Sequence, residues 1–144
     1  MLSIREMTIA DHPAVIDLLR RTTGVRLRQV DSCAAVQRYL ERNPGLSFVA
    51  EESGRVVGCI MSGHDGRRGY LQHLAVLLSF RRRGIGKDLV ACCIERLAKL
   101  GIFKSHIDVL VDNDSAAAFW EHLGWVKRAD IHRFSFIASG GEDV

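Results

Sequence analysis

The chain has 144 residues, of which 47% are hydrophobic and 26% are charged. Because this is the size and balance of one soluble globular domain, we expect a single domain over residues 1–144. No apolar run approaches the ~20 residues of a membrane helix, and the N-terminus lacks the apolar stretch of a signal peptide, so we expect a cytoplasmic protein without a membrane partner. The formal net charge of +3 suits an anionic ligand but falls short of the basic stripe of a nucleic-acid binder.

Start and stop signals divide the first half of the chain. Asp11 followed by Pro13 is typical of a helix start, and Asn43-Pro44-Gly45 is typical of a helix end. Glu52-Ser53-Gly54 is typical of a tight turn between two strands. The predicted elements are a strand over residues 4–7, a helix beginning at Asp11, a second helix over 32–42, and two strands over 46–51 and 55–62.

The second half contains the clearest helix, over residues 84–100, in which apolar residues recur every four positions from Ile85 to Leu97. The other predicted elements are strands over 70–77 and 107–111, a helix over 114–122 begun by Asn113 or Asp114, and closing strands over 125–127 and 132–137. A strand–helix–strand unit therefore lies between two segments whose strands are predicted to pair antiparallel. This order predicts an α/β fold (α+β mixed), with a mixed central sheet of about seven strands and helices on both faces.

The segment from Phe80 to Lys87, Phe-Arg-Arg-Arg-Gly-Ile-Gly-Lys, connects a predicted strand to the clearest helix. Gly84 and Gly86 carry no Cβ atom, so a ligand can approach the backbone closely there. The N–H groups of a helix's first turn have no partner within the helix, and the helix dipole favours negative charge beside them. Together with the basic side chains of the segment, these features predict an anion-binding site.

Other motifs fit this segment less well. A phosphate-binding Walker loop needs a Gly at position 81 and Ser or Thr at position 88, where this chain has Arg81 and Asp88. A dinucleotide fingerprint needs a small residue at Leu89. A nucleic-acid patch made by Arg81–Arg83 would be small, and a solvated basic turn without a ligand stays open as an alternative.

The pattern Arg81-x-x-Gly84-x-Gly86 resembles the pyrophosphate loop of the GNAT superfamily of N-acetyltransferases. Leu74-Ala75-Val76 precede it at the spacing of that family. Asn113 and Trp120, followed by Leu123-Gly124-Trp125, resemble the family's N-x(7)-Y-x-x-L-G-[FY] segment. The resemblance covers nearly the whole chain. It is closest to the bacterial enzymes that acetylate protein N-termini, such as ribosomal-protein alanine acetyltransferases, and to small uncharacterised relatives.

The resemblance implies that the chain binds acetyl-CoA as a cosubstrate, with no metal. Backbone amides from Arg82 to Lys87 are expected to hold the pyrophosphate, and the N–H of Val76 to polarise the thioester carbonyl. Asn113 is expected either to contact the pantetheine arm or to cap the helix that follows it. The expected contacts of the cofactor are Leu74, Ala75, Val76, Arg81, Arg82, Arg83, Gly84, Ile85, Gly86, Lys87, Asn113 and Trp120.

The catalytic side chains are less clear. Trp120 stands where the family usually has the Tyr that protonates the leaving thiolate, and an indole N–H does not titrate usefully. Asp108, on the predicted fifth strand, matches the position of a catalytic Glu in related N-terminal acetyltransferases and is a candidate base. Tyr70 is a candidate for acid–base or positioning work. In a regular strand Gln72 shares the face of Tyr70 and His73 points to the opposite face, but a bulge, usual in the family, would change this.

These features predict an acetyl-CoA-dependent N-acetyltransferase in which a primary amine attacks directly in a ternary complex. The alternative is an acyl-CoA-binding sensor, or pseudoenzyme, without turnover, and Trp120 is the feature that favours it. The expected acceptor is an amine-bearing small molecule or a peptide or protein N-terminus. A homodimer is possible, and no nucleic-acid or membrane partner is expected.

Overall fold

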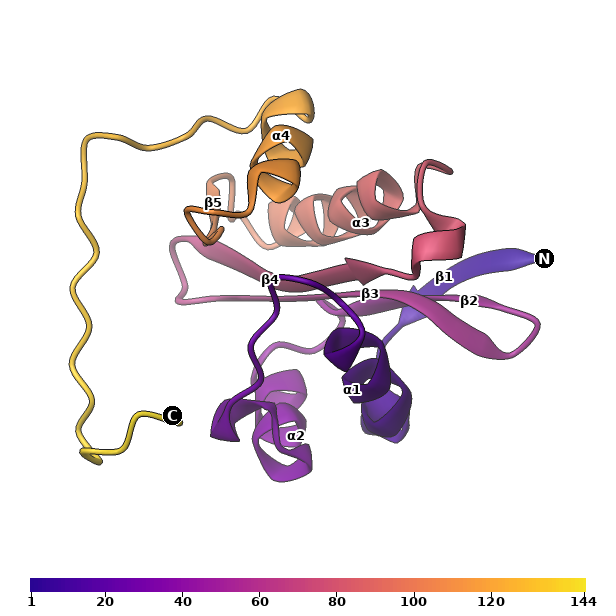
Figure 1. Cartoon of the computed structure of the whole chain (residues 1–144), viewed down its shortest axis with the longest axis horizontal. Helices are drawn as coiled ribbons and strands as arrows, with labels where there is room; N and C mark the ends of the chain where they lie inside the picture. Colours follow the sequence, from indigo (N-terminus) through magenta and orange to yellow (C-terminus); the bar gives the residue numbers. More distant parts are fainter. The chain divides into compact units, whose positions relative to one another are not determined.

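The computed structural model describes residues 1–144. The chain divides into two compact units, Met1–Asp108 and Val109–Val144. In the first unit the strands are β1 (Leu2–Glu6), β2 (Phe48–Glu52), β3 (Arg55–His64), β4 (Gly69–Val76) and β5 (Ser105–Ile107), and the helices are α1 (His12–Arg20), α2 (Cys33–Arg42) and α3 (Ile85–Lys99) (Figure 1). Its short 3-10 helices are η1 (Ile9–Asp11), η2 (Gln29–Asp31) and η3 (Leu78–Phe80). The second unit contains α4 (Asp114–His122).

The sheet of the first unit has the strand order β1-β2-β3-β4-β5. The first four strands pair antiparallel, whereas β5 pairs parallel to β4. The β2–β3 turn is as tight as the sequence predicts, because Ser53 and Gly54 take φ angles of 52° and 78°, the left-handed conformation of a two-residue hairpin. The parallel pair requires a crossover, which α3 supplies. The mixed sheet that the sequence predicts is therefore confirmed.

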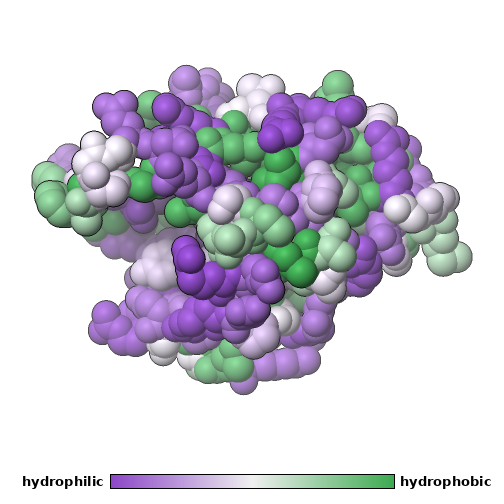
Figure 2. Space-filling view, turned by 90° about the horizontal axis from the view of Figure 1, so that it is seen from below, coloured by the Kyte–Doolittle hydropathy of each residue, from purple (hydrophilic) through white to green (hydrophobic).

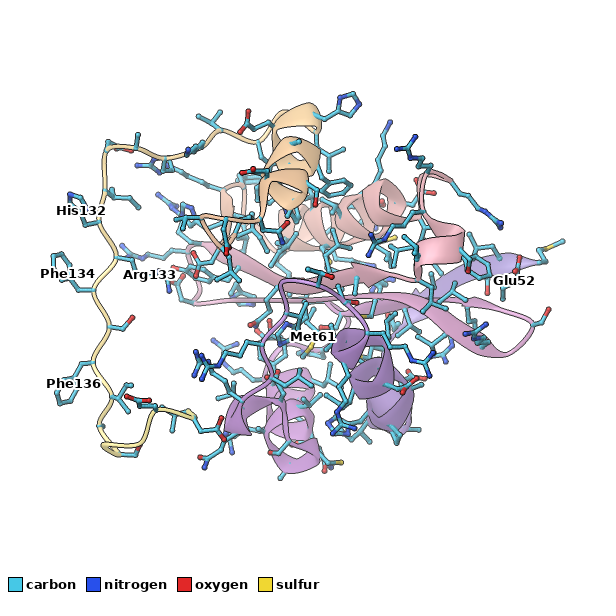
Figure 3. The ribbon with its side chains drawn as sticks, in the orientation of Figure 1. Glu52, Met61, His132, Arg133, Phe134 and Phe136 are labelled. Carbon is cyan, nitrogen blue, oxygen red and sulfur yellow. The ribbon has the colours of Figure 1, made fainter.

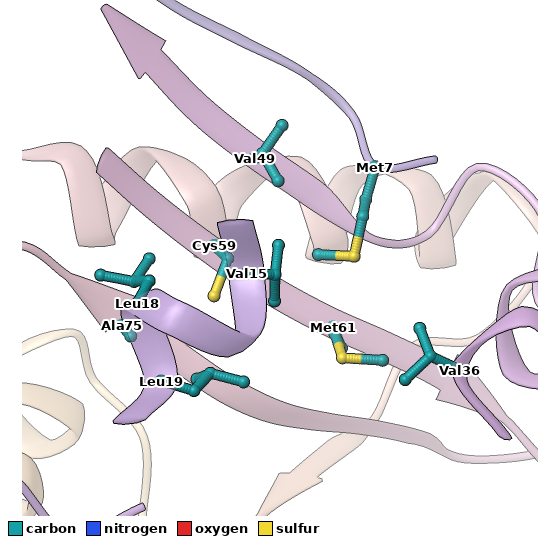
Figure 4. Close-up of a cluster of buried hydrophobic side chains, with 9 residues drawn as sticks. All are labelled: Met7, Val15, Leu18, Leu19, Val36, Val49, Cys59, Met61 and Ala75. Atoms are coloured by element: carbon teal, nitrogen blue, oxygen red, sulfur yellow. The ribbon is translucent and has the colours of Figure 1, made fainter. Parts of the chain in front are cut away.

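Helices cover both faces of this sheet, with α1 and α2 on one face and α3 on the other (Figure 1). A buried cluster lies between the sheet and α1 and α2, and Figure 4 shows its members: Met7, Val15, Leu18, Leu19, Val36, Val49, Cys59, Met61 and Ala75. On the other face Ile85, Leu89 and Leu97 of α3 are each 1% exposed or less, which confirms the predicted apolar repeat. Figure 2 views the molecule from the α1–α2 side, where hydrophilic residues surround separate hydrophobic patches.

The helix starts agree with the sequence except for one cap. Ser32 accepts a hydrogen bond from Ala35 N at 3.2 Å, and Asn113 does the same for Ala116 N at 3.2 Å. Asp11 precedes α1 as predicted, but its carboxylate does not cap that helix. The carboxylate turns back instead and accepts from the backbone N–H of Thr8 at 2.8 Å.

The predicted sheet was wrong at its C-terminal end. Strand β5 ends at Ile107 rather than at residue 111, and residues 125–127 and 132–137 form no strand, so the sheet has five strands. The side chains of His132, Phe134 and Phe136 point to one side of the chain and that of Arg133 to the other, as in a strand (Figure 3). Phe134 and Phe136 are nevertheless each 92% exposed. Alternation alone does not make a strand, because the backbone needs a partner to form a ladder.

No helix of the chain is both long enough and apolar enough to cross a membrane.

Candidate active site

The loop before α3 presents unpaired backbone N–H groups. Gly84 occupies the N-cap position with a φ of 80°, and no side chain caps the helix. The first-turn N–H groups of Ile85, Gly86 and Lys87 therefore keep no partner within the protein. Arg82 also has a positive φ, 65°, which bends the loop a second time. The loop thus has the curved, donor-rich backbone that binds phosphate groups.

The basic side chains of this loop divide into two pairs. Arg81 donates from Nε to the carbonyl of Val76 at 3.2 Å, and Arg83 stacks over the ring of Phe80, 4.8 Å from its centroid. These two side chains hold the loop in place. Arg82 and Lys87 are exposed and make no such contact, so their charges are available to an anion. The sequence predicted this group of cations but not the division between them.

Strand β4 has an open outer edge beside this loop. It pairs with β5 only over Gly69–Leu71, so the edge from Gln72 to Val76 has no strand partner. Leu77 donates its N–H to Val57 O of β3 at 2.9 Å. Because alternate residues of a strand point their N–H groups to opposite sides, the N–H of Val76 points away from β3 and toward the open edge. The structure therefore presents at Val76 the donor that the family resemblance implies.

A bulge interrupts β4 just before this edge donor. Cys59 lies opposite Ala75 and Met61 lies opposite Gln72, so β4 has one residue more than β3 between these pairs. His73 lies in the bulge with a φ of 55°. Its side chain reaches Asp31, the last residue of η2. Gln72 lies opposite Met61, a member of the cluster under α1 and α2, so Gln72 and His73 both point to this face of the sheet. The regular-strand placement of His73 opposite Gln72 therefore does not apply, and the alternative that the sequence analysis left open, a bulge that changes the alternation, is the one observed.

The Asp31–His73 contact is the part of the site that the sequence did not reveal. His73 Nε2 lies 2.6 Å from Asp31 Oδ1, and the two residues are 42 positions apart. Asp31 is itself only 8% exposed. Its other oxygen accepts from Arg28 N at 2.8 Å, and His12 Nε2 lies 2.8 Å from its carbonyl. No motif links these residues along the chain, because tertiary packing alone brings them together.

The two predicted acid–base residues of the first unit lie at other places. Asp108 is exposed and follows the end of β5, so its predicted place within that strand was wrong. Tyr70 is 39% exposed near the start of β4, and its hydroxyl donates to Asp65 Oδ2 at 3.4 Å. The ring of Tyr70 also lies against His106 of β5, with centroids 5.8 Å apart. Tyr70 thus belongs to the paired part of β4 and not to its open edge.

The remaining two predicted contacts belong to the second unit. Asn113 caps α4 through its side chain, which supports the cap interpretation without excluding a ligand. Trp120 is 6% exposed, and its ring packs edge-on against Phe119 at 5.3 Å and Trp125 at 4.7 Å between centroids. Within this unit Trp120 is therefore a packed core residue.

Comparison with known proteins decides the family. The acetyltransferase (GNAT) family matches residues 12–125 of this chain. The chain belongs to the GNAT family. An acetyltransferase of Pectobacterium atrosepticum is 36% identical over 122 residues, which make up 85% of this chain and 86% of that relative. An acetyltransferase of Sodalis glossinidius is 39% identical over 122 residues, 85% of each chain. The chain is accordingly an N-acetyltransferase.

Solved structures agree with this fold. The ribosomal-protein-S18-alanine N-acetyltransferase of Escherichia coli matches with a TM-score of 0.72 and 24% identity, over 86% of this chain and 77% of that one. An N-acetyltransferase of Thermoplasma acidophilum, solved in complex with coenzyme A, matches with a TM-score of 0.76 and 18% identity, over 85% of this chain and 88% of that one. At these identities the likeness concerns the fold alone.

Proposed function

We propose that this GNAT protein transfers an acetyl group from acetyl-CoA to a primary amine, which attacks directly in a ternary complex. The observation that carries the proposal is the uncapped start of α3, where Gly84 is left-handed and exposed cations stand beside free N–H groups. This is a site for a pyrophosphate rather than for a single carboxylate, because several donors converge along a bent backbone. When bound, acetyl-CoA supplies the activated thioester.

The residues of β4 fit the other end of the same ligand. The pantetheine arm is proposed to lie along the open edge at Leu74 and Ala75, where its amide groups replace the missing strand partner. The N–H of Val76 points toward this edge and would stabilise negative charge on the thioester oxygen. Asn113 and Trp120 of the second unit stay proposed contacts of the arm.

The thiols of the core support direct attack. Burial raises the pKa of Cys59 and of Cys93 to about 12, so neither forms the thiolate that an acetyl-enzyme intermediate requires. The acetyl group therefore passes straight to the amine in this proposal.

The groups around the reacting atoms are proposed as follows. Asp108 is a carboxylate directly after β5 and would attract the amine in its ammonium form. Tyr70 would position the acceptor from the paired part of β4. Trp120 cannot protonate the departing thiolate, so the thiolate of CoA leaves as such and takes its proton from water. This is tolerable near neutral pH, since an unperturbed thiol has a pKa of about 8.5.

The acceptor is proposed to be an amine-bearing small molecule or a peptide N-terminus. Proteins of similar fold include an alanine N-acetyltransferase of a ribosomal protein and an aminoglycoside N-acetyltransferase in complex with CoA. Their acceptors span both classes, and a shared fold does not fix the substrate. A panel of small amines and short peptides, scored by release of free CoA thiol, would identify the class.

Gly86→Glu tests the cofactor site. Acetyl-CoA should raise the melting temperature of the wild type, because a ligand selective for the native state stabilises it. Gly86→Glu should abolish this shift, since it adds bulk and negative charge beside the pyrophosphate, while leaving the fold intact. Ala91→Glu, which places the same charge on the exposed side of α3, is the matched control and should keep the shift.

Two outcomes would count against the proposal. A normal shift in Gly86→Glu would show that the ligand does not bind at this loop. Binding of acetyl-CoA by the wild type without thiol release across the whole amine panel would favour the acyl-CoA-binding sensor instead.

A further inference from the structure

The bulge of β4 fixes His73 in a conformation that a regular strand would not give it. Its φ of 55° is uncommon for a residue other than glycine. The carbonyl of His73 accepts from the buried thiol of Cys59 at 3.3 Å, which holds the bulge from the core side. Residues kept in such conformations concentrate at functional sites, where the surrounding structure compensates for the strain.

Asp31 determines which nitrogen of His73 is free. The Asp31 carboxylate is held by the N–H of Arg28 and is a hydrogen-bond acceptor only. The 2.6 Å contact therefore places a proton on His73 Nε2, which donates it to Asp31 Oδ1. In the neutral imidazole Nδ1 then carries the lone pair. No hydrogen bond from the protein reaches that atom, so it is free to accept a proton from a ligand.

His73 also stands at the right place for an incoming amine. It lies three residues before Val76, on the part of β4 that has no β5 partner. Its side chain reaches to Asp31 on the α1–α2 face, whereas the anion site lies at the start of α3 on the opposite face (Figure 1). The cofactor would be held by its pyrophosphate on the α3 face, with its thioester at the open edge of β4. An amine that arrives from the α1–α2 face would meet the thioester there.

We propose that His73 is the general base of the transfer and that Asp31 is its positioning residue. The inference rests on the proposed acetyl transfer. Nδ1 of His73 takes one proton from the ammonium form of the acceptor and later releases it to water. The amine nitrogen then forms a bond to the acetyl carbon, the C–S bond breaks, and the thiolate keeps the electron pair. The second proton of the nitrogen ends on the thiolate through water, which gives amide and free CoA thiol.

The geometry favours His73 over Asp108. Imidazole changes protonation near neutral pH, where an efficient base must operate. Asp108 is exposed beyond the end of β5, whereas His73 is pre-oriented by a buried carboxylate. The arrangement of free nitrogen, oriented imidazole and carboxylate is that of a base with its orienting group. Asp108 keeps the proposed role of attracting the ammonium group.

The experiment compares His73→Asn with Asp108→Asn and with His122→Asn, a control on the exposed end of α4. Asparagine is chosen because it tolerates the positive φ at position 73. His73→Asn should lower kcat/KM by about 10²-fold or more, with unchanged affinity for acetyl-CoA in calorimetry. Added imidazole should restore part of the lost rate, and the acidic limb of the pH–rate profile should disappear. His122→Asn should stay close to the wild type. Asp108→Asn should lose less than His73→Asn, through a higher KM for the amine, and should keep the acidic limb.

The pH profile also depends on the neighbours of His73. These are Asp31 of η2, His12 of α1 on the Asp31 carbonyl, Arg28 before η2 and Cys59 of β3. His12→Asn should therefore be measured alongside and should retain the acidic limb. Near-normal turnover in His73→Asn, or a larger loss in Asp108→Asn, would overturn the inference while leaving acetyl transfer intact. A wild type that neither binds acetyl-CoA nor releases thiol would instead overturn the proposed function.

Discussion

Asp11 and Asp31 occupy two copies of one local structure. Each is the last residue of a three-residue 3-10 helix, and each accepts a backbone N–H from three positions earlier, Thr8 N and Arg28 N, at 2.8 Å. Each residue is 8% exposed. The partners differ, because Asp11 pairs with Arg5 and Asp31 pairs with His73.

This difference separates a structural contact from a chemical one. Arginine keeps its charge and offers donors only, so the Arg5 guanidinium simply holds Asp11 between β1 and α1. Arg5 donates to Asp11 from two nitrogens, at 2.9 and 2.8 Å, and to Glu51 as well. Histidine can donate or accept and can change charge. A buried carboxylate in the same local structure therefore fixes β1 against α1 at Asp11, whereas at Asp31 it orients an imidazole that can transfer protons.

Replacement of Asp31 should lower activity more than replacement of Asp11. In Asp31→Asn the amide can donate to His73 Nε2, which moves the imidazole proton to Nδ1 and removes the lone pair that faces the acceptor. We expect kcat/KM to fall at least about 10-fold, with acetyl-CoA binding retained. Stability should change little, because the imidazole adapts to the new donor. Thiol-release kinetics and thermal melts measure the two effects side by side.

The matched replacement, Asp11→Asn, should lower stability and leave activity unchanged. An asparagine amide placed against the guanidinium sets donor against donor, and arginine cannot adapt by accepting. We expect a loss of about 1–2 kcal/mol in the free energy of unfolding, kept modest because the Arg5 side chain is 40% exposed. Turnover below the melting transition should be that of the wild type. If Asp11→Asn lowered kcat/KM as strongly as Asp31→Asn, the distinction between the two pairs would be lost.

The same contrast explains what the sequence could predict. The anion site is local, since Gly84, Gly86 and the cations lie within one turn of the start of a periodic helix, and the pattern was readable before any fold was known. The His73–Asp31 pair depends on a bulge and on a contact across 42 positions, which no local pattern encodes. The element order up to α3 was likewise predicted from helix start and stop signals and turns, as at Asp11 and Asn43.

The errors in the predicted strands have one physical origin. Residues 132–137 alternate in the way that a strand does, and residues 109–111 form an apolar Val-Leu-Val run shortly after β5. Both segments satisfy the side-chain pattern of a strand but have no hydrogen-bonded neighbour in the sheet. A periodic pattern reports which side chains share a face, not whether a partner strand is present.

The smallest expected effect is on acid stability. Hydrogen bonding to Arg5 lowers the pKa of Asp11 below its usual value, and burial, which would raise this pKa, only partly opposes the shift. A group whose pKa is lower in the folded state binds its proton more readily in the unfolded state. Asp11 therefore contributes stability above the unfolded pKa of about 3.9, and this contribution is lost as the pH falls through the folded value.

Asp11→Asn provides the test of that contribution, since the variant has no carboxylate to titrate. The difference in melting temperature between wild type and Asp11→Asn should be largest above the unfolded pKa of about 3.9 and should shrink as the pH falls through the lowered folded pKa of Asp11, where its carboxylate becomes protonated. A constant gap between wild type and Asp11→Asn across this range would mean that the Arg5–Asp11 pair stabilises the fold by packing and not by charge.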